Sequence, residues 1–492
     1  MQSYLKFVIF FAHVKIHFRE LECARLKQSP RLIFIFLSYI ARKAISKHCN
    51  AVETSPRFIC REPGSKRRVG LTHCHVRLRH IYYAPININV IIDYVGAGTS
   101  PLAYAEYKSL IEFGETIRLI PLVHLPFGKK SCITQTYDHH KLLKDFKHFI
   151  IPNIETLESS PNIWEFYKHV FDGSFIRLMN YPRNPVTRLR MLVTAEKLNE
   201  LYKLYGFPNV LHVGMFGETA LLTMIISRKI KVPYTIMLHS SDFMMKGKRR
   251  ARYLKKVCQE AAAVITISNF NKGYLTALGV DHEKLHVVKA GIDVERFKRK
   301  SNYKADNIIL YVGRLVRFKG LEYLLHAAKI LDQYNIKFKV MLVGEGPLEN
   351  ELKDLAARLN VQHLIEFKGF VSDDELPSIY ENSQIFVHPS VELSDGRRDG
   401  IPVSLMEAMS MELPVVSTYC SGIPELVEDG WNGILVRQRD PLQLAEAIRY
   451  LLENPSVARE YGKRGREKIV REHDIKKNTK KLLDIFKEVS SK

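Results

Sequence analysis

The stretch IILYVGRLVRFKG, residues 308–320, decides the fold class. Its apolar start predicts a buried strand, and the glycine-flanked basic segment after it predicts a turn. Apolar residues then recur at helical spacing, and FKVMLV (338–343) is predicted to be the next strand. Strand, glycine-containing loop, helix and strand form the repeating unit of a doubly wound α/β sheet. We therefore expect a parallel sheet with helices on both faces.

The same alternation extends over most of the chain and stops once, at the charged segment KAGIDVERFKRK (289–300). We predict two Rossmann-like doubly wound domains that face each other across a cleft. Ligands of such sheets bind beyond the carboxyl ends of the strands. The expected organisation is a basic N-terminal extension, a first Rossmann-like domain, a linker, a second Rossmann-like domain and a C-terminal helix, at residues 1–85, 86–290, 291–303, 304–475 and 476–492.

Charge and cysteine are concentrated at the start of the chain. The 492 residues carry a net charge of +22, and residues 1–85 hold 16 Lys and Arg against 4 Glu, which leaves +10 for the rest. Seven cysteines without paired spacing favour a reducing, cytoplasmic compartment. The apolar run LIFIFLSYI (32–40) is too short to span a bilayer. HCHVRLRH (73–80) lacks the paired spacing of a zinc site.

Two loops that follow predicted strands are candidates for phosphate binding. Gly96 and Gly98 follow the strand at 88–93, where they allow backbone N–H groups to approach a phosphate or simply form a tight turn. Arg314 and Lys319 lie in the basic turn of the opening stretch. Two cations beside a helix N-terminus suit a diphosphate, and the alternative is a solvated basic loop.

The segment DGRRDGIPVSLMEAM (395–409) places two acids around a helix start. Asp399 precedes Gly400, Ile401 and Pro402, and we expect proline at the first helical position. Glu407 follows nearly two turns later, about 9 Å along the axis. A buried glutamate needs a partner, for which a sugar hydroxyl is suitable, whereas on the outer face of the helix it would contact solvent.

Two further features lie in the first predicted domain. His239, in LHSSD (238–242), ends a strand and is either a packed histidine or a catalytic one. Seven cations occur in KGKRRARYLKK (246–256), which form either a solvated helix face or a patch for anionic lipid. These cations are Lys246, Lys248, Arg249, Arg250, Arg252, Lys255 and Lys256.

Four motifs resemble the retaining glycosyltransferases of family 4, which have the GT-B fold. They are GRLVRFKG, LVGEGPLENEL, FKGFVSDDELPSIY and DGIPVSLMEAMSMELPVVSTYCSGIPELVEDGWNGILV. The chain is most similar to the exopolysaccharide subgroup of the colanic-acid type, over about residues 86–475. The E-x7-E signature of the family falls on Asp399 and Glu407, with Asp in place of the first Glu. That shorter acid puts the donor identity in question.

The resemblance implies a role for each candidate residue. Asp399 would face the donor sugar and Glu407 the ribose, with His239 near the transferred sugar. Arg314 and Lys319 would hold the diphosphate, with the Gly96–Gly98 loop close to the phosphates, and the loop at Val371 would touch the base. Residues 86–290 would be the acceptor domain and residues 304–475 the nucleotide-sugar donor domain. Gly400, Ile401 and Pro402 belong to the same donor site.

The resemblance implies a retaining transferase, and the chemistry of the leaving group argues against a hydrolase. A nucleoside diphosphate leaves readily once its charge is met, so the two acids orient the donor instead of forming the acid pair of a glycosidase. No Asp-x-Asp occurs in the sequence, and we expect no cofactor and no metal. The expected partners are a nucleotide sugar, a saccharide or lipid-linked oligosaccharide acceptor and a peripheral anionic membrane surface on the cytoplasmic side, with no nucleic acid.

Two alternatives remain from the sequence. A nucleotide-sugar epimerase would share the two domains and act without an acceptor. A nucleic-acid-binding protein would use the positive charge, but it would need aromatic residues among its basic ones. The run 246–256 contains only Tyr253.

Overall fold

The computed structural model describes most of the chain beyond residue 206. It covers residues 206–492 except 215, 240–243, 245, 301–306 and 335, the backbone of 87–92, 116–121 and 147–148, and eight positions between 109 and 203. All of these fall within one compact unit, Tyr82–Lys492. Residues 1–85, Gly96 and Gly98 lie outside the described part, so the predictions made for them stay predictions.

The first sheet has seven parallel strands in the order β3-β2-β1-β4-β5-β6-β7. Its strands are β1 (Asn87–Ile92), β2 (Thr116–Pro121), β3 (Lys147–His148), β4 (Val210–Val213), β5 (Tyr234–Leu238), β6 (Ala263–Thr266) and β7 (Leu285–Val287). The described helices that connect them are α8 (Glu218–Ile230), α9 (Lys248–Glu260), α10 (Asn269–Ala277) and the 3-10 turn η3 (His282–Lys284). The strand order reverses between β1 and β4, as it does in doubly wound sheets.

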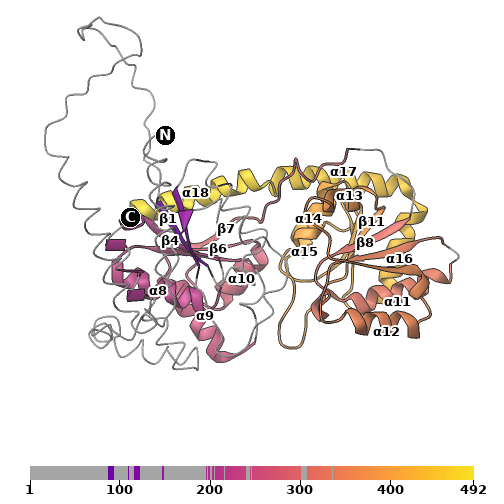
Figure 1. Cartoon of the computed structure of the whole chain (residues 1–492), viewed down its shortest axis with the longest axis horizontal. Helices are drawn as coiled ribbons and strands as arrows, with labels where there is room; N and C mark the ends of the chain where they lie inside the picture. The colour runs from indigo at the N-terminus through magenta and orange to yellow at the C-terminus, as the bar shows by residue number, and fades with distance from the viewer. Residues whose placement is uncertain are drawn as a thin grey trace, which may run out of the picture. The chain divides into compact units, whose positions relative to one another are not determined.

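The second sheet repeats this plan with six parallel strands, β10-β9-β8-β11-β12-β13. Its strands are β8 (Ile308–Val312), β9 (Lys339–Val343), β10 (Ile365–Gly369), β11 (Ile385–His388), β12 (Val415–Thr418) and β13 (Ile434–Val436). Its helices are η4 (Arg317–Lys319), α11 (Leu321–Asp332), α12 (Glu349–Arg358), η5 (Gln362–Leu364), α13 (Leu376–Glu381), α14 (Val403–Ser410), α15 (Ile423–Leu426), α16 (Pro441–Glu453) and α17 (Pro455–Glu472). Figure 1 shows α11, α12 and α16 beside this sheet. The expectation of two Rossmann-like sheets is confirmed.

The chain connects the two sheets twice. Ile292 donates its N–H to the carbonyl of His473 at 2.8 Å, and Ile475 donates to the carbonyl of Ile292 at 3.0 Å. The last helix, α18 (Ile475–Ser491), then packs against β4 of the first sheet. The rings of Phe486 and His212 are 5.0 Å apart at that contact. The C-terminal residues therefore complete the first domain.

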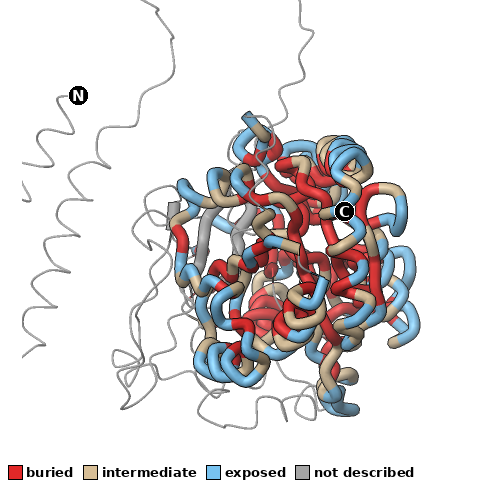
Figure 2. Tube along the Cα trace, turned by 90° about the vertical axis from the view of Figure 1, so that its right-hand side faces the viewer, coloured by how far each residue is buried: buried red, intermediate tan, exposed pale blue. Residues whose placement is uncertain are grey.

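Strand and helix interiors are apolar, as the sequence pattern requires. Buried segments form the inside of each layer, while turns and outer helix faces are exposed (Figure 2). Three apolar clusters result, one of which joins α14 and α17 to the inner face of α18. None of the helices in the described part of the chain is long and apolar enough to cross a membrane.

One helix start differs from its prediction. We expected Pro402 at the first helical position, but it is the N-cap residue, with φ −66° and an extended ψ of 128°. Its carbonyl accepts the first bonds of the helix, from the N–H groups of Leu405 and Met406. The proline ring fixes φ but not ψ, so the sequence could not show whether Pro402 is the first helical residue or the residue before it.

Candidate functional site

The central feature of the candidate site is a tight approach between two loops of the second sheet. The basic turn after β8 ends at Gly320, which has φ +66°. A Cβ at this position would lie 2.1 Å from the carbonyl oxygen of Pro389, just after β11. Only glycine fits there. Because Gly320 has no side chain, the turn can approach the end of β11 closely, and Lys319 then lies at the switch point of the strand order.

Lys319 forms a shielded ion pair with Asp399. Its Nζ lies 2.8 Å from Oδ1 of Asp399, and the two side chains are 13% and 11% exposed. The other carboxylate oxygen, Oδ2, is 3.1 Å from Nε2 of His388 and accepts a hydrogen bond from the hydroxyl of Ser390. Lys319 Nζ is also 3.3 Å from His388 Nε2. We call these four residues the Asp399 cluster.

Electrostatics fix the charges in this cluster. Burial alone would raise the pKa of Asp399, but the Lys319 ammonium and the hydrogen bond from His388 outweigh it, so the pKa lies well below its usual range. Burial, together with Lys319, lowers the pKa of His388. At neutral pH the cluster therefore holds one carboxylate, one ammonium and a neutral imidazole.

This arrangement differs from the expected pair of free cations. Lys319 already has a carboxylate partner, whereas Arg314, five residues earlier in the same turn, is exposed. The carbonyl of Arg314 accepts a hydrogen bond from the Tyr311 hydroxyl at 2.9 Å, which holds the turn against the strand. Arg314 thus presents a guanidinium to solvent beside a neutralised pair.

Glu407 occupies α14 and is only partly exposed. The hydroxyl of Tyr380 donates to its Oε2 at 2.8 Å. Burial raises the pKa of Glu407 to about 7, although the Tyr380 hydrogen bond and the charge of Arg296 oppose the shift. Near neutral pH this side chain exists in both forms, so it can donate to a hydroxyl as well as accept from one.

His239 lies where β5 ends and is partly buried. Burial lowers the pKa of its imidazole to about 4, so the ring is neutral at physiological pH. A Cβ on Gly400 would lie 3.1 Å from the carbonyl oxygen of His239. Lys246 donates its N–H to the carbonyl of Asp395 at 3.1 Å. The structure therefore brings the loop at 395–400 beside the segment after β5.

The remaining donor candidates line the same edge of the second sheet. Val371, two residues beyond β10, is 9% exposed, and its neighbour Phe370 is 57% exposed. Ile401 and Pro402 are buried residues of the loop that leads into α14. No measured contact links Arg314, Val371 and Glu407 directly within the described residues, so their joint role depends on a ligand that spans them.

The polybasic segment forms helix α9 and is not uniformly exposed. Lys246, Lys248, Arg249 and Arg252 are exposed. The other three cations are partly buried: Arg250 lies over the ring of Phe216, and Lys256 pairs with Glu260 at 2.8 Å. Four cations thus remain for an outside partner.

Sequence reasoning missed His388, Ser390, Tyr380 and Arg398. His388 and Ser390 follow the apolar run at 385–387, and a polar pair at a strand end was a usable signal. Tyr380 had no such signal, because its contact with Glu407 joins two helices that are 27 residues apart. Arg398 pairs with Glu392 and also contacts the Met244 sulfur at 3.0 Å and the Phe270 ring.

Two doubly wound parallel sheets of this order are the architecture of the GT-B class. The family model "Glycosyltransferase Family 4" matches residues 164–296, and "Glycosyl transferases group 1" matches residues 293–468. Residues 164–468 are therefore similar to these two glycosyltransferase families.

Two curated relatives are similar to part of this chain. The chain is 37% identical over 188 residues to the putative colanic acid biosynthesis glycosyltransferase WcaL of Salmonella typhimurium. The aligned residues make up 38% of this chain and 46% of that protein. It is 36% identical over 187 residues to the amylovoran biosynthesis glycosyltransferase AmsK of Erwinia amylovora. The aligned residues again make up 38% of this chain and 46% of that protein. The chain spans about half the length of the curated relatives it matches.

A solved structure supports the fold. Anabaena Alr3699/HepE in complex with UDP has a TM-score of 0.62 and 16% identity, over 82% of this chain and 100% of that one. The likeness at this identity concerns the fold alone.

Proposed function

We propose that this protein is a retaining glycosyltransferase. It transfers a hexose from a nucleotide-diphosphate sugar to a saccharide acceptor, which is lipid-linked, in exopolysaccharide biosynthesis. The observation that carries the proposal is the Asp399 cluster at the switch point of the second sheet, in a chain that matches both glycosyltransferase family models. The colanic acid and amylovoran relatives support the pathway class.

In this proposal the cluster orients the donor and neutralises the leaving group. Asp399 accepts hydrogen bonds from the donor sugar while His388 and Ser390 hold its second oxygen. Lys319 turns toward the diphosphate as negative charge develops there, and exposed Arg314 adds a second cation. Glu407 bonds the ribose hydroxyls, and His239 lies beside the reacting sugar. The UDP bound to the Anabaena protein is consistent with a nucleotide sugar as the donor.

No metal or other cofactor takes part in the proposed reaction. Cations of the chain itself meet the diphosphate charge, which is the task that a divalent ion performs elsewhere. The acceptor approaches from the first domain, where exposed Lys248, Arg249 and Arg252 attract an anionic lipid surface.

The test is a panel of nucleotide sugars, with release of nucleoside diphosphate measured in the presence of lipid-linked saccharides. We expect one donor to be turned over, at the same rate in EDTA, and NMR of the product to show retained anomeric configuration. Turnover of the donor without any acceptor, to an isomeric sugar nucleotide, would contradict the proposal and favour the epimerase.

Variants of the cluster connect this activity to the site. Lys319→Met should lower nucleoside diphosphate release at least 100-fold, a loss typical of removing one group that stabilises developing charge. The double variant K319M/D399N removes both charges of the pair, so it should fold and stay inactive. The control Lys337→Met, at an exposed position, should retain full activity. An active K319M protein would exclude Lys319 from the reaction.

A further inference from the structure

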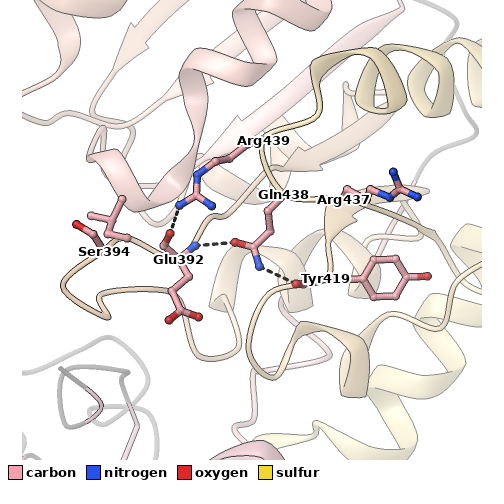
Figure 3. Close-up of a pocket in the computed structure, with 7 residues that line it drawn as sticks. Glu392, Ser394, Tyr419, Arg437, Gln438 and Arg439 are labelled. Atoms are coloured by element: carbon pink, nitrogen blue, oxygen red, sulfur yellow. Dashed lines mark hydrogen bonds between the residues drawn. The ribbon is translucent and has the colours of Figure 1, made fainter. Parts of the chain in front are cut away.

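A pocket of about 580 Å³ opens at the carboxyl ends of β11, β12 and β13, beside the Asp399 cluster but with no lining residue in common with it. Its walls are the loop after β11 and the residues just beyond β12 and β13 (Figure 3). The lining residues are Glu392, Leu393, Ser394, Tyr419, Arg437, Gln438 and Arg439. This volume lies in the usual range for small-ligand sites.

Hydrogen bonds hold the floor of the pocket in place. The Gln438 side chain accepts from the N–H of Glu392 at 2.7 Å and donates to the carbonyl of Tyr419 at 2.8 Å. The guanidinium of Arg439 donates to the carbonyl of Glu392. Figure 3 shows these three bonds as one chain across the pocket. The walls therefore belong to one fixed unit.

The charge of the pocket is positive. The Glu392 carboxylate is paired with Arg398, which lies outside the lining. Arg437 and Arg439 are both exposed, and neither forms an ion pair with any residue in the described part of the chain. Two guanidinium groups that form no ion pair favour a carboxylate or phosphate ligand, which guanidinium binds in a fork geometry.

The pocket also carries an aromatic surface. Tyr419 is 50% exposed, and its hydroxyl bonds Asp429 at 3.1 Å, which fixes the ring. Thr418 pairs with Val436 in the β12–β13 ladder, so Tyr419 and Arg437 follow at neighbouring positions of the sheet edge. A flat ring beside cations is suited to a sugar that stacks on the ring and bears an acidic group.

The position of the pocket relative to the Asp399 cluster indicates which substrate the pocket would bind. His388 ends β11, whereas Arg437 follows β13, two strands away or about 10 Å at the usual strand spacing. Ser390 of the cluster and Glu392 of the pocket belong to the same loop. The pocket is thus adjacent to the proposed donor site without overlapping it.

We propose that this pocket binds an acidic sugar residue of the acceptor, one bearing a carboxylate or a phosphate, next to the residue that is glycosylated. Arg437 and Arg439 bind the acidic group and Tyr419 stacks on the sugar face. This proposal rests on the proposed function, because it takes the acidic sugar to be part of the glycosyl acceptor. Binding of the acidic sugar itself needs no donor and no turnover.

Calorimetry with the full chain tests it through a matched pair of disaccharides. Cellobiouronic acid differs from cellobiose by its carboxylate, and cellobiose 6′-phosphate separates phosphate from carboxylate as the preferred group. We expect at least one acidic disaccharide to bind at least 10-fold more tightly than cellobiose. The double variant R437Q/R439Q should lose that preference, and Tyr419→Ala should weaken the acidic and the neutral disaccharide alike.

A control variant accounts for the overall positive charge. R358Q/R459Q removes the same charge at two exposed positions outside the pocket and should keep the preference. Equal affinity for acidic and neutral disaccharides, or an unchanged preference in R437Q/R439Q, would overturn the proposal. Binding of UDP, GDP, ADP and dTDP, followed by thermal shift, should be the same in all variants, so a failure of all four to bind the unaltered protein would count against the proposed function instead.

Discussion

At the scale of single residues, the two signature acids have opposite environments. Asp399 is held ionised by Lys319 and His388, whereas Glu407 has one hydrogen-bond donor, Tyr380, and a pKa of about 7. The ordinary pKa of Glu407 would be 4.5. The two carboxyl groups at the ends of one motif can therefore have two roles, one as a fixed charge and one as a switchable donor or acceptor.

The raised pKa of Glu407 predicts a pH dependence of stability. A raised acid pKa means that the folded protein binds the proton more tightly, so folding is penalised as the pH rises from about 4.5 through 7 and the full penalty persists above. Glu407→Gln removes the charge. Its free energy of unfolding, relative to the unaltered protein, should rise by about 3 kcal/mol between pH 4.5 and pH 8.

Urea unfolding at several pH values measures this difference. The control Glu446→Gln changes an exposed acid on α16 and should show no such trend. A pH-independent difference for Glu407→Gln would mean that the carboxyl titrates normally in the folded protein.

At the scale of elements, α9 separates its charges by face. Its buried side contains Tyr253, Leu254, Val257 and Cys258, which fixes the side on which the cations lie. Lys248, Arg249 and Arg252 are exposed there, and each cation near an anionic membrane contributes about 1 kcal/mol.

Replacing these three cations should weaken binding to anionic vesicles. K248Q/R249Q/R252Q should lower the partition coefficient for phosphatidylserine vesicles by about two orders of magnitude, from roughly 1 kcal/mol per charge. Sedimentation with vesicles of graded phosphatidylserine content measures it. K476Q/K480Q/K481Q removes the same charge from exposed positions of α18. An equal loss in both variants would indicate attraction by net charge, with no special role for α9.

The sequence predicted the elements well and the contacts between them poorly. Apolar periodicity located the strands because parallel strands are buried on both faces. It could not find that Lys319 and Asp399 meet, since 80 residues separate them and the contact depends on the strand order β8-β11. Nor could it show that only four of the seven cations at 246–256 are exposed, because that depends on packing around Phe216 and Glu260.

At the scale of the whole molecule, the first sheet depends on the last helix. Phe486 is fully buried and meets His212 of β4, and it shares an apolar cluster with Val210. Phe486→Ala should lower the free energy of unfolding by 3–5 kcal/mol, as expected for a large buried aromatic.

Denaturant unfolding monitored by circular dichroism checks this value. Lys481→Ala, on the exposed face of the same helix, should change stability by less than about 0.5 kcal/mol. A small effect of Phe486→Ala would mean that α18 is not required for the first sheet.

The chain returns to the first sheet only after it has formed the second, so the two sheets are completed in a fixed order during synthesis. The ribosome releases β4 (Val210–Val213) long before α18 (Ile475–Ser491). Until α18 has been synthesised, the apolar surface that Phe486 will cover stays open to other proteins, while the second sheet is already complete. A nascent chain of this protein should therefore need a chaperone for its first half longer than for its second.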